Sequence, residues 1–125
     1  MKTKLVTILA FVSVLALAMV GYYTFNSPLY ISAEDAKKGI AEGKFPIVLD
    51  VRTDMEYNLG HYPGAVHIPT AKLADQVEHT LPDKTKPVLV YCNTGQRSRY
   101  AADLLKKKGY ETVRYITGPH WSLLR

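Results

Sequence analysis

Two patterns of apolar residues alternate along residues 24–125: short continuous runs and a repeat at every third or fourth position. Two short apolar runs, residues 47–51 and 87–91, predict strands that are buried on both faces of a sheet. Around these runs, apolar residues recur at every third or fourth position, as they do on the inner face of a helix. Strands that alternate with helices predict an α/β fold, in which a central, mainly parallel sheet is flanked by helices.

Residues with strong end preferences mark the boundaries of these elements. Ser32 suits the N-cap of the first helix, and Thr53 with Glu56 has the spacing of a capping box. Thr70 is expected to cap a later helix, and Gly109 to end the last long one. We expect helices over residues 32–43, 53–59, 70–81 and from the loop after residue 91 to 108, with further strands over residues 65–68 and 112–116.

The first 23 residues form a segment of their own, ahead of one folded domain over residues 24–125. Lys2 and Lys4 precede an apolar stretch without any charged side chain. Within this stretch, Ala16-Leu17-Ala18 has the small-x-small form of a signal-peptide cleavage site. The pattern therefore fits an export signal that is removed from the mature protein.

The same stretch also fits a membrane anchor that is never cleaved. Residues 5–23 are uncharged, and their number is close to the roughly 20 residues that cross a bilayer as a helix. Tyr22, Tyr23 and Phe25 would then form an aromatic belt at the far interface. The sequence leaves cleavage and retention open. Both interpretations place the domain on the periplasmic or extracytoplasmic side, because Lys2 and Lys4 should stay in the cytoplasm.

Charge and metal-ligand spacing exclude some classes of function. Without Lys2 and Lys4, the chain has 14 basic and 11 acidic residues, an excess too small to predict a nucleic-acid partner. His67 and His79 have no metal-ligand spacing with any partner. We therefore expect neither a metal nor another cofactor.

The single cysteine, Cys92, lies where a strand passes through a tight loop into a helix. Such a loop forms an anion-binding cradle, because its backbone N–H groups converge and the helix dipole adds positive charge. A thiol at its mouth is expected to be partly ionised near neutral pH, since these donors favour the thiolate. Arg97 adds a permanent positive charge and a planar fork suited to oxyanions. This arrangement predicts a nucleophilic cysteine that acts on an anionic substrate.

The loop sequence C-x-x-G-x-R-S resembles the active-site loop of rhodanese-like sulfurtransferases. The resemblance covers roughly residues 29–121. It extends to the domain opening at residues 31–34, to a D-V-R strand at residues 47–52, and to a signature over residues 56–69 that contains Glu56-Tyr57 and Gly60-His61-Tyr62-Pro63-Gly64-Ala65. It implies the rhodanese-like three-layer α/β fold.

The resemblance also implies an activity. The Cys92 thiolate would attack the outer sulfur of a donor such as thiosulfate, release sulfite and become a persulfide. A thiophilic acceptor, cyanide or a thiol, would then take the sulfur. Backbone N–H groups of residues 93–98 would stabilise the anionic persulfide, and Arg97 would attract the donor.

The other positions of the loop are given supporting roles. Asn93, Thr94 and Gln96 are expected to line the mouth and influence the choice of donor. Gly95 is expected to adopt a backbone conformation that a side chain would resist. Ser98 is expected either to cap the following helix or to donate a hydrogen bond to sulfur.

Three residues outside the loop complete the candidate site. Asp50 and Arg52 flank the end of a buried strand, where a structural charge pair is the expected role. His61 belongs to the family's signature, in which it usually supports the fold. The chain departs from the family at Gly118-Pro119-His120-Trp121, where proline replaces a second glycine and tryptophan comes one residue early. We nevertheless expect Trp121 to fill the core.

Two alternative functions are weighed against the sulfurtransferase. Cysteine phosphatases of the C-x5-R type have five residues between cysteine and arginine, whereas four separate Cys92 from Arg97. This shorter loop favours a sulfur atom over a tetrahedral phosphate. The second alternative is a non-catalytic sulfur carrier or protein-interaction module of the same fold. The physiological donor, the acceptor and the oligomeric state do not follow from the sequence.

Overall fold

Four short strands build a single parallel sheet in the computed structural model, which describes residues 1–124. The strands lie in the order β2-β1-β3-β4. They are β1 (Ile47–Asp50), β2 (Val66–His67), β3 (Val88–Tyr91) and β4 (Val113–Tyr115). Leu49 pairs with both Val66 of β2 and Val90 of β3, so β1 and β3 form the centre of the sheet. All four residues of β3 are buried, as its continuous apolar sequence predicts.

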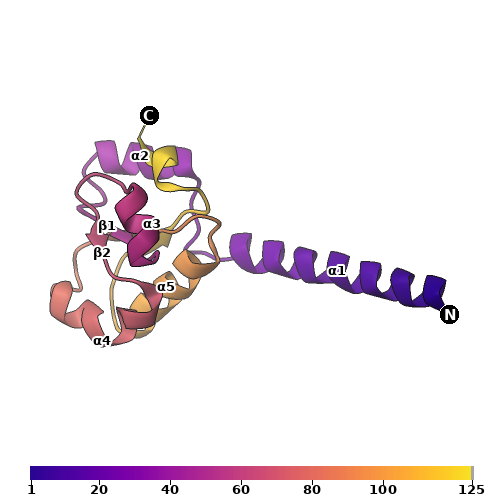
Figure 1. The fold of residues 1–125 in the computed structure, drawn as a ribbon. Coiled ribbons are helices and arrows are strands. Elements are labelled where there is room, and N and C mark those ends of the chain that lie inside the picture. Colours follow the sequence, from indigo (N-terminus) through magenta and orange to yellow (C-terminus); the bar gives the residue numbers. More distant parts are fainter. Residues whose placement is uncertain (125) are drawn as a thin grey trace.

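Helices cover both faces of this sheet (Figure 1). They are α2 (Ala33–Ala41), α3 (Asp54–Leu59), α4 (Thr70–Thr80), α5 (Gln96–Lys107) and a closing 3-10 helix, His120–Leu123. One apolar cluster joins the sheet to α4 and α5 through Leu73, Val77 and Leu105. A second cluster joins the opposite face to α2 and the 3-10 helix through Ala36 and Leu123. The predicted α/β architecture with helices on both faces is confirmed.

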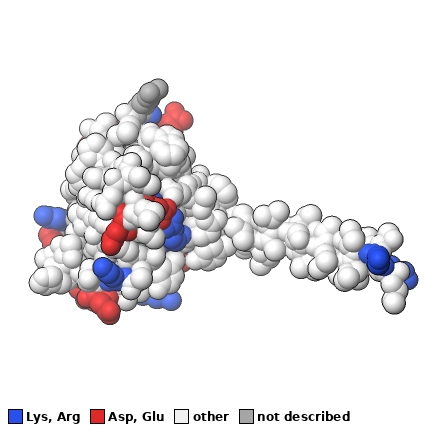
Figure 2. Space-filling view, in the orientation of Figure 1, with Lys and Arg blue, Asp and Glu red and all other residues white. Residues whose placement is uncertain are grey.

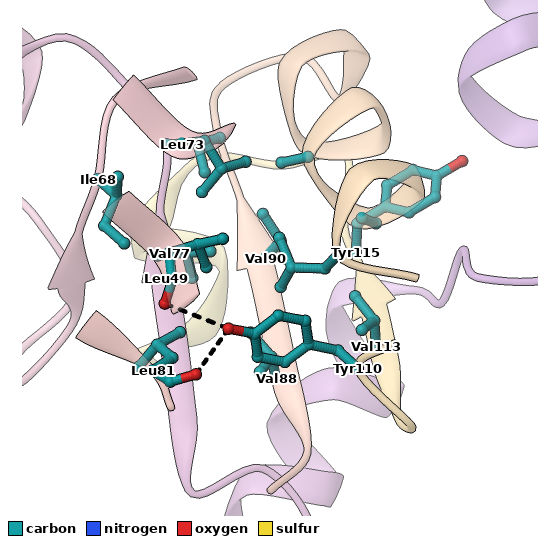
Figure 3. Packing of buried hydrophobic residues seen from close by; sticks show 14 of the residues in the cluster. Leu49, Ile68, Leu73, Val77, Leu81, Val88, Val90, Tyr110, Val113 and Tyr115 are labelled. Atoms are coloured by element: carbon teal, nitrogen blue, oxygen red, sulfur yellow. Dashed lines mark hydrogen bonds between the residues drawn. The ribbon is translucent and has the colours of Figure 1, made fainter. Parts of the chain in front are cut away.

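Buried tyrosines contribute to this core as well as aliphatic residues. Tyr110 is buried among Val77, Leu81 and Val113, as Figure 3 shows. Its hydroxyl donates to the carbonyl of Leu81 at 2.6 Å and lies 3.2 Å from the carbonyl of Val77. These bonds satisfy the polar end of a buried side chain and join the C-terminal end of α4 to the segment between α5 and β4.

The helix ends agree with the sequence at most positions. The Ser32 hydroxyl accepts a bond from the N–H of Asp35, and Thr53 with Glu56 forms the predicted capping box. The prediction for Thr70 is wrong, because Pro69 holds the N-cap position and Thr70 is the first helical residue. Pro69 is extended, which suits a residue that leads into a helix. Gly109 follows the last turn of α5 and has a φ of +94°, a backbone conformation that favours glycine.

A long apolar helix, α1 (Lys2–Phe25), projects from this domain (Figure 1). Its length and composition are sufficient to cross a membrane, although a signal sequence meets the same criteria. Figure 2 shows positive charge at its free end and none along the shaft up to the domain. The helix continues through Thr24, which is its one buried residue. Its C-terminal turn therefore contacts the domain rather than leading into a separate linker.

Candidate active site

Cys92 directly follows β3, at the carboxyl edge of the sheet. Its side chain is buried, and Sγ accepts a hydrogen bond of 3.1 Å from the backbone N–H of Gly95. The thiol in turn lies 3.5 Å from the hydroxyl of Ser98. A donor directed at sulfur stabilises the anionic form of the side chain, which is the nucleophilic form.

Gly95 occupies a position that no other residue could take without strain. Its φ is +102°, and it is the N-cap of α5. A Cβ atom at Gly95 would lie 2.7 Å from Cγ2 of Thr24 and 2.8 Å from Cγ2 of Thr117. Both the backbone conformation and the space around it therefore require glycine, as the sequence predicted for the conformation.

Ser98 lies in the first turn of α5 and is completely buried. Its Oγ lies 3.1 Å from the carbonyl of Gly95 and 3.0 Å from that of Ile116. The hydroxyl has one proton, which it donates to one of these carbonyls while its oxygen accepts from the Cys92 thiol. These partners are carbonyls and not backbone N–H groups of the first turn, so the Ser98 hydroxyl does not cap α5. Ser98 therefore contacts the sulfur, but it also ties the loop to the residue after β4.

Arg97 is paired with a carboxylate that we did not single out from the sequence as a site residue. Its Nη1 and Nη2 donate to Glu56 at 2.7 Å and 3.0 Å, which is a bidentate contact. Asn93 also donates to Glu56, at 2.6 Å. Glu56 thus fastens α3 to the loop that carries Cys92.

The charge of Glu56 is strongly stabilised in this position. The hydrogen bond from Arg97 lowers the pKa of Glu56 to about 2, and the backbone and hydroxyl of Thr53 act in the same direction. Because Glu56 compensates it, Arg97 is not an isolated positive charge. The capping-box spacing indicated that Glu56 is placed at the start of a helix, but the helix had to be positioned in three dimensions to reveal Arg97 as a partner.

Thr94 and Gln96 contact each other across the tip of the loop. The Thr94 hydroxyl donates to Oε1 of Gln96. The amide nitrogen of Gln96 points toward α1 and lies 3.4 Å from the Thr24 hydroxyl. Thr94 is exposed and Asn93 is half-buried, so both lie at the solvent-facing side of the Cys92 loop.

Asp50 and Arg52 form the expected ion pair beneath the site. Nη2 of Arg52 lies 2.7 Å from Oδ2 of Asp50 and also donates to the carbonyl of Gly60 at 2.7 Å. The Tyr91 hydroxyl donates to the same carboxylate at 2.5 Å. Burial acts to raise the pKa of Asp50, but the bonds from Arg52 and Tyr91 outweigh it and hold this pKa below its ordinary value. The network is closed and buried, as a structural pair requires.

His61 is held within the segment that follows α3. Its Nδ1 lies 2.9 Å from the carbonyl of Tyr57, and the two rings stack with centroids 3.7 Å apart. These contacts are compatible with the supporting role expected for His61. Across residues 1–124, no group of three or more His, Cys, Asp or Glu side chains is arranged to hold a metal ion.

A hollow of about 530 Å³ lies beside the loop, between α3 and the 3-10 helix. Arg52, Glu56 and Asn93 line one side of it, while Pro119, His120 and Trp121 line the other. This hollow offers an approach to the loop from solvent.

The prediction that Trp121 fills the core is wrong, because its side chain is 64% exposed. Pro119 is extended and the 3-10 helix starts directly after it, so Leu123 becomes the buried residue of the closing turn. Pro119 and the exposed indole ring of Trp121 therefore form part of the edge of the hollow.

Comparison with known proteins agrees with this geometry. The family described as "Rhodanese-like domain" matches residues 32–118. The chain belongs to the rhodanese-like family. Its sequence is 36% identical over 70 residues to thiosulfate sulfurtransferase PspE of Escherichia coli (strain K12), which covers 56% of this chain and 67% of that protein.

Two other similarities support less than the match to PspE, because one covers only part of a longer protein and the other shows only the fold. The tRNA uridine(34) hydroxylase of Buchnera aphidicola (subsp. Baizongia pistaciae, strain Bp) is 29% identical over 97 residues, or 74% of this chain, but this chain spans only 31% of that protein. The human single-domain sulfurtransferase TSTD1 superposes with a TM-score of 0.65 at 24% identity, covering 78% of this chain and 96% of that one. This last similarity shows the rhodanese-like fold. Residues 1–31, and therefore α1, lie outside the family match.

Proposed function

We propose that this protein is a sulfurtransferase that moves sulfane sulfur from a small anionic donor to a thiophilic acceptor through a persulfide on Cys92. The main support is the hydrogen bond of 3.1 Å from the Gly95 N–H to Sγ of Cys92, in a loop that joins a buried strand to a helix N-terminus. The homology to a thiosulfate sulfurtransferase points to thiosulfate as the donor to test first.

The first half-reaction forms one S–S bond and breaks another. The thiol of Cys92 loses its proton to solvent, and the thiolate attacks the outer sulfur of thiosulfate. The S–S bond of thiosulfate breaks, and its electron pair leaves with sulfite. The Cys92 persulfide carries a negative charge, which the Gly95 N–H and the N-terminus of α5 stabilise.

The second half-reaction returns the enzyme to its starting state. Cyanide or a thiolate attacks the outer sulfur of the persulfide, and the electron pair of the S–S bond returns to Sγ of Cys92. The two half-reactions share one covalent intermediate, so we expect ping-pong kinetics. No metal or organic cofactor is required by these steps.

We also propose that the domain works on the outer side of a membrane. Lys2 and Lys4 at the free end of α1, followed by an uncharged shaft, support this orientation. Residues 1–23 would serve as the export signal or anchor, and residues 24–125 as the catalytic domain. The partners in this proposal are a sulfur donor, an acceptor and the membrane itself, and they do not include a nucleic acid.

A non-catalytic sulfur carrier is the second candidate. Its support is that Cys92 is buried and that Glu56 compensates the charge of Arg97, so an anionic donor meets no free cation there. A carrier would accept sulfur from a partner protein and show no turnover with thiosulfate and cyanide.

The deciding experiment uses the full chain in detergent micelles, with Cys92→Ser as the matched control. We expect thiosulfate to add the mass of one sulfur atom to the wild type, and cyanide to remove it as thiocyanate over many turnovers. The control should do neither. A folded, thiol-reactive wild type that takes up no sulfur from thiosulfate would contradict the enzyme proposal, and uptake without turnover would favour the carrier.

A further inference from the structure

The last turn of α1 packs directly against the loop that carries Cys92. Thr24 is only 2% exposed, whereas the flanking residues Tyr23 and Phe25 are 40% and 56% exposed. Its Cγ2 methyl fills the space that a Cβ at Gly95 would need, 2.7 Å from that position. The methyl therefore borders Gly95, whose N–H donates to the sulfur of Cys92.

Hydrogen bonds hold Thr24 at this place from two sides. The buried Tyr115 hydroxyl, at the end of β4, donates to the Thr24 carbonyl at 2.6 Å. The Gln96 amide lies 3.4 Å from the Thr24 hydroxyl, which itself donates to the carbonyl of Val20 at 2.7 Å. The backbone and the side chain of Thr24 are thus both fixed relative to the loop.

Arg99, in the first turn of α5, also contacts the end of α1. Its guanidinium donates to the carbonyls of Tyr23 and Asn26 and lies 4.2 Å from the centre of the Tyr23 ring. A cation at this end of α1 also stabilises the helix dipole. The N-terminal turn of α5 is therefore joined to the C-terminal turn of α1.

We propose that Thr24 is a positioning residue of the active site, through which α1 holds Gly95 in the conformation that directs its N–H at Cys92. The inference rests on the proposed function only in taking Cys92 as the nucleophile. It assigns a role to a residue outside the part of the chain that matches the family, residues 32–118. In this view the C-terminal turn of the apolar helix is a structural part of the site, whichever of the two N-terminal roles the helix has.

The test compares two threonines of α1 that make the same local hydrogen bond. Thr7 donates to the carbonyl of Thr3 at 2.8 Å as Thr24 does to Val20, but Thr7 is exposed and far along the helix from the domain. Thr24→Ala removes the methyl beside Gly95, whereas Thr7→Ala removes an equivalent group with no such neighbour. Thr24→Val keeps a methyl in place and removes the hydroxyl.

The readout is the pH profile of Cys92 alkylation by iodoacetamide, in the full chain in detergent. We expect the midpoint of the Thr24→Ala profile to move to higher pH by about half a unit, because a Gly95 N–H that is less well directed stabilises the thiolate less. Thr7→Ala should keep the wild-type profile. Thr24→Val keeps a methyl beside Gly95 but loses the hydroxyl near Gln96, so its midpoint should lie between those of the wild type and Thr24→Ala. A merely destabilised fold would lower the melting temperature without moving this midpoint.

Sulfur uptake from thiosulfate is measured on the same variants, so that the two proposals fail separately. A Thr24→Ala midpoint that coincides with that of Thr7→Ala would overturn the positioning role, whether or not sulfur is transferred. A shifted midpoint in a protein that takes up no sulfur would support the positioning role and contradict only the sulfurtransferase proposal.

Discussion

Two arginine–carboxylate pairs lie around the site, and they differ in their surroundings. Asp50 and Arg52 are almost fully buried at the end of β1, and a tyrosine hydroxyl and a backbone carbonyl complete their hydrogen bonds. Glu56 and Arg97 join α3 to the loop that carries Cys92, and their side chains are 29% and 36% exposed. The first pair is almost completely shielded from solvent, whereas the second lies at the surface beside the Cys92 loop.

This difference in burial indicates that the Asp50–Arg52 pair stabilises the fold, whereas the Glu56–Arg97 pair can rearrange. Removing one partner of a buried pair leaves an uncompensated charge, which strongly destabilises the fold. A partly exposed pair contributes little to stability, because water screens it. Of the two pairs, Glu56–Arg97 is therefore the one that can release its arginine to an anion at the smaller cost.

The largest effect on stability is expected from Asp50→Asn. The substitution keeps the size of the side chain but leaves Arg52 charged and buried, at a cost of about 3 kcal/mol in the free energy of unfolding. Urea denaturation of the full chain in detergent would measure it. Glu56→Gln is the matched control, and an equal loss for the two variants would refute the contrast between the pairs.

A smaller effect, on reactivity instead of stability, is expected from Glu56→Gln. Glutamine retains the helix-capping geometry and removes the negative charge, so Arg97 becomes an unpaired cation beside the loop. We expect the ratio of the Cys92 alkylation rates with anionic iodoacetate and neutral iodoacetamide to rise about threefold to tenfold, since one charge is removed near the mouth. Arg97→Gln should lower the same ratio, and a ratio that neither variant changes would show that this pair does not control access of anions.

The smallest expected effect is a pH dependence of the melting temperature. The pKa of Glu56 is about 2 in the folded protein, below its ordinary value of 4.5. A lowered pKa in the folded state stabilises the protein above the unfolded pKa, and this contribution is lost as the pH falls toward 2. Melting temperatures of wild type and Glu56→Gln, measured between pH 6 and about pH 2, should therefore converge on acidification. A difference that stays constant over this range would contradict the lowered pKa.

The sequence predicted the elements that depend on local patterns. The apolar runs of β1 and β3 and the capping box of α3 were recognisable because neighbouring residues determine them. The position of Cys92 at the end of β3, and the special conformation of Gly95, followed from the same strand-loop-helix pattern. The roles assigned to the loop residues in sulfur transfer remain predictions.

The contacts that connect distant segments could not be predicted in this way. Glu56 and Arg97 are paired across 41 positions, and Gln96 and Thr24 across 72. Trp121 was misplaced because its burial depends on how Pro119 directs the closing turn, which the composition of that segment does not determine. These features depend on how the helices are arranged around the sheet, and local periodicity carries no information about that arrangement.

The contact between Thr24 and the Cys92 loop also determines where the sulfur atom lies relative to the end of α1. If α1 stays in a bilayer, Sγ of Cys92 is held at a fixed height above the lipid and moves with the helix in two dimensions. A protein thiol embedded in the same membrane would then meet it at a high effective concentration, provided that it reaches the same height. Sulfur acceptance would be governed by geometry normal to the membrane as much as by the chemistry of the loop.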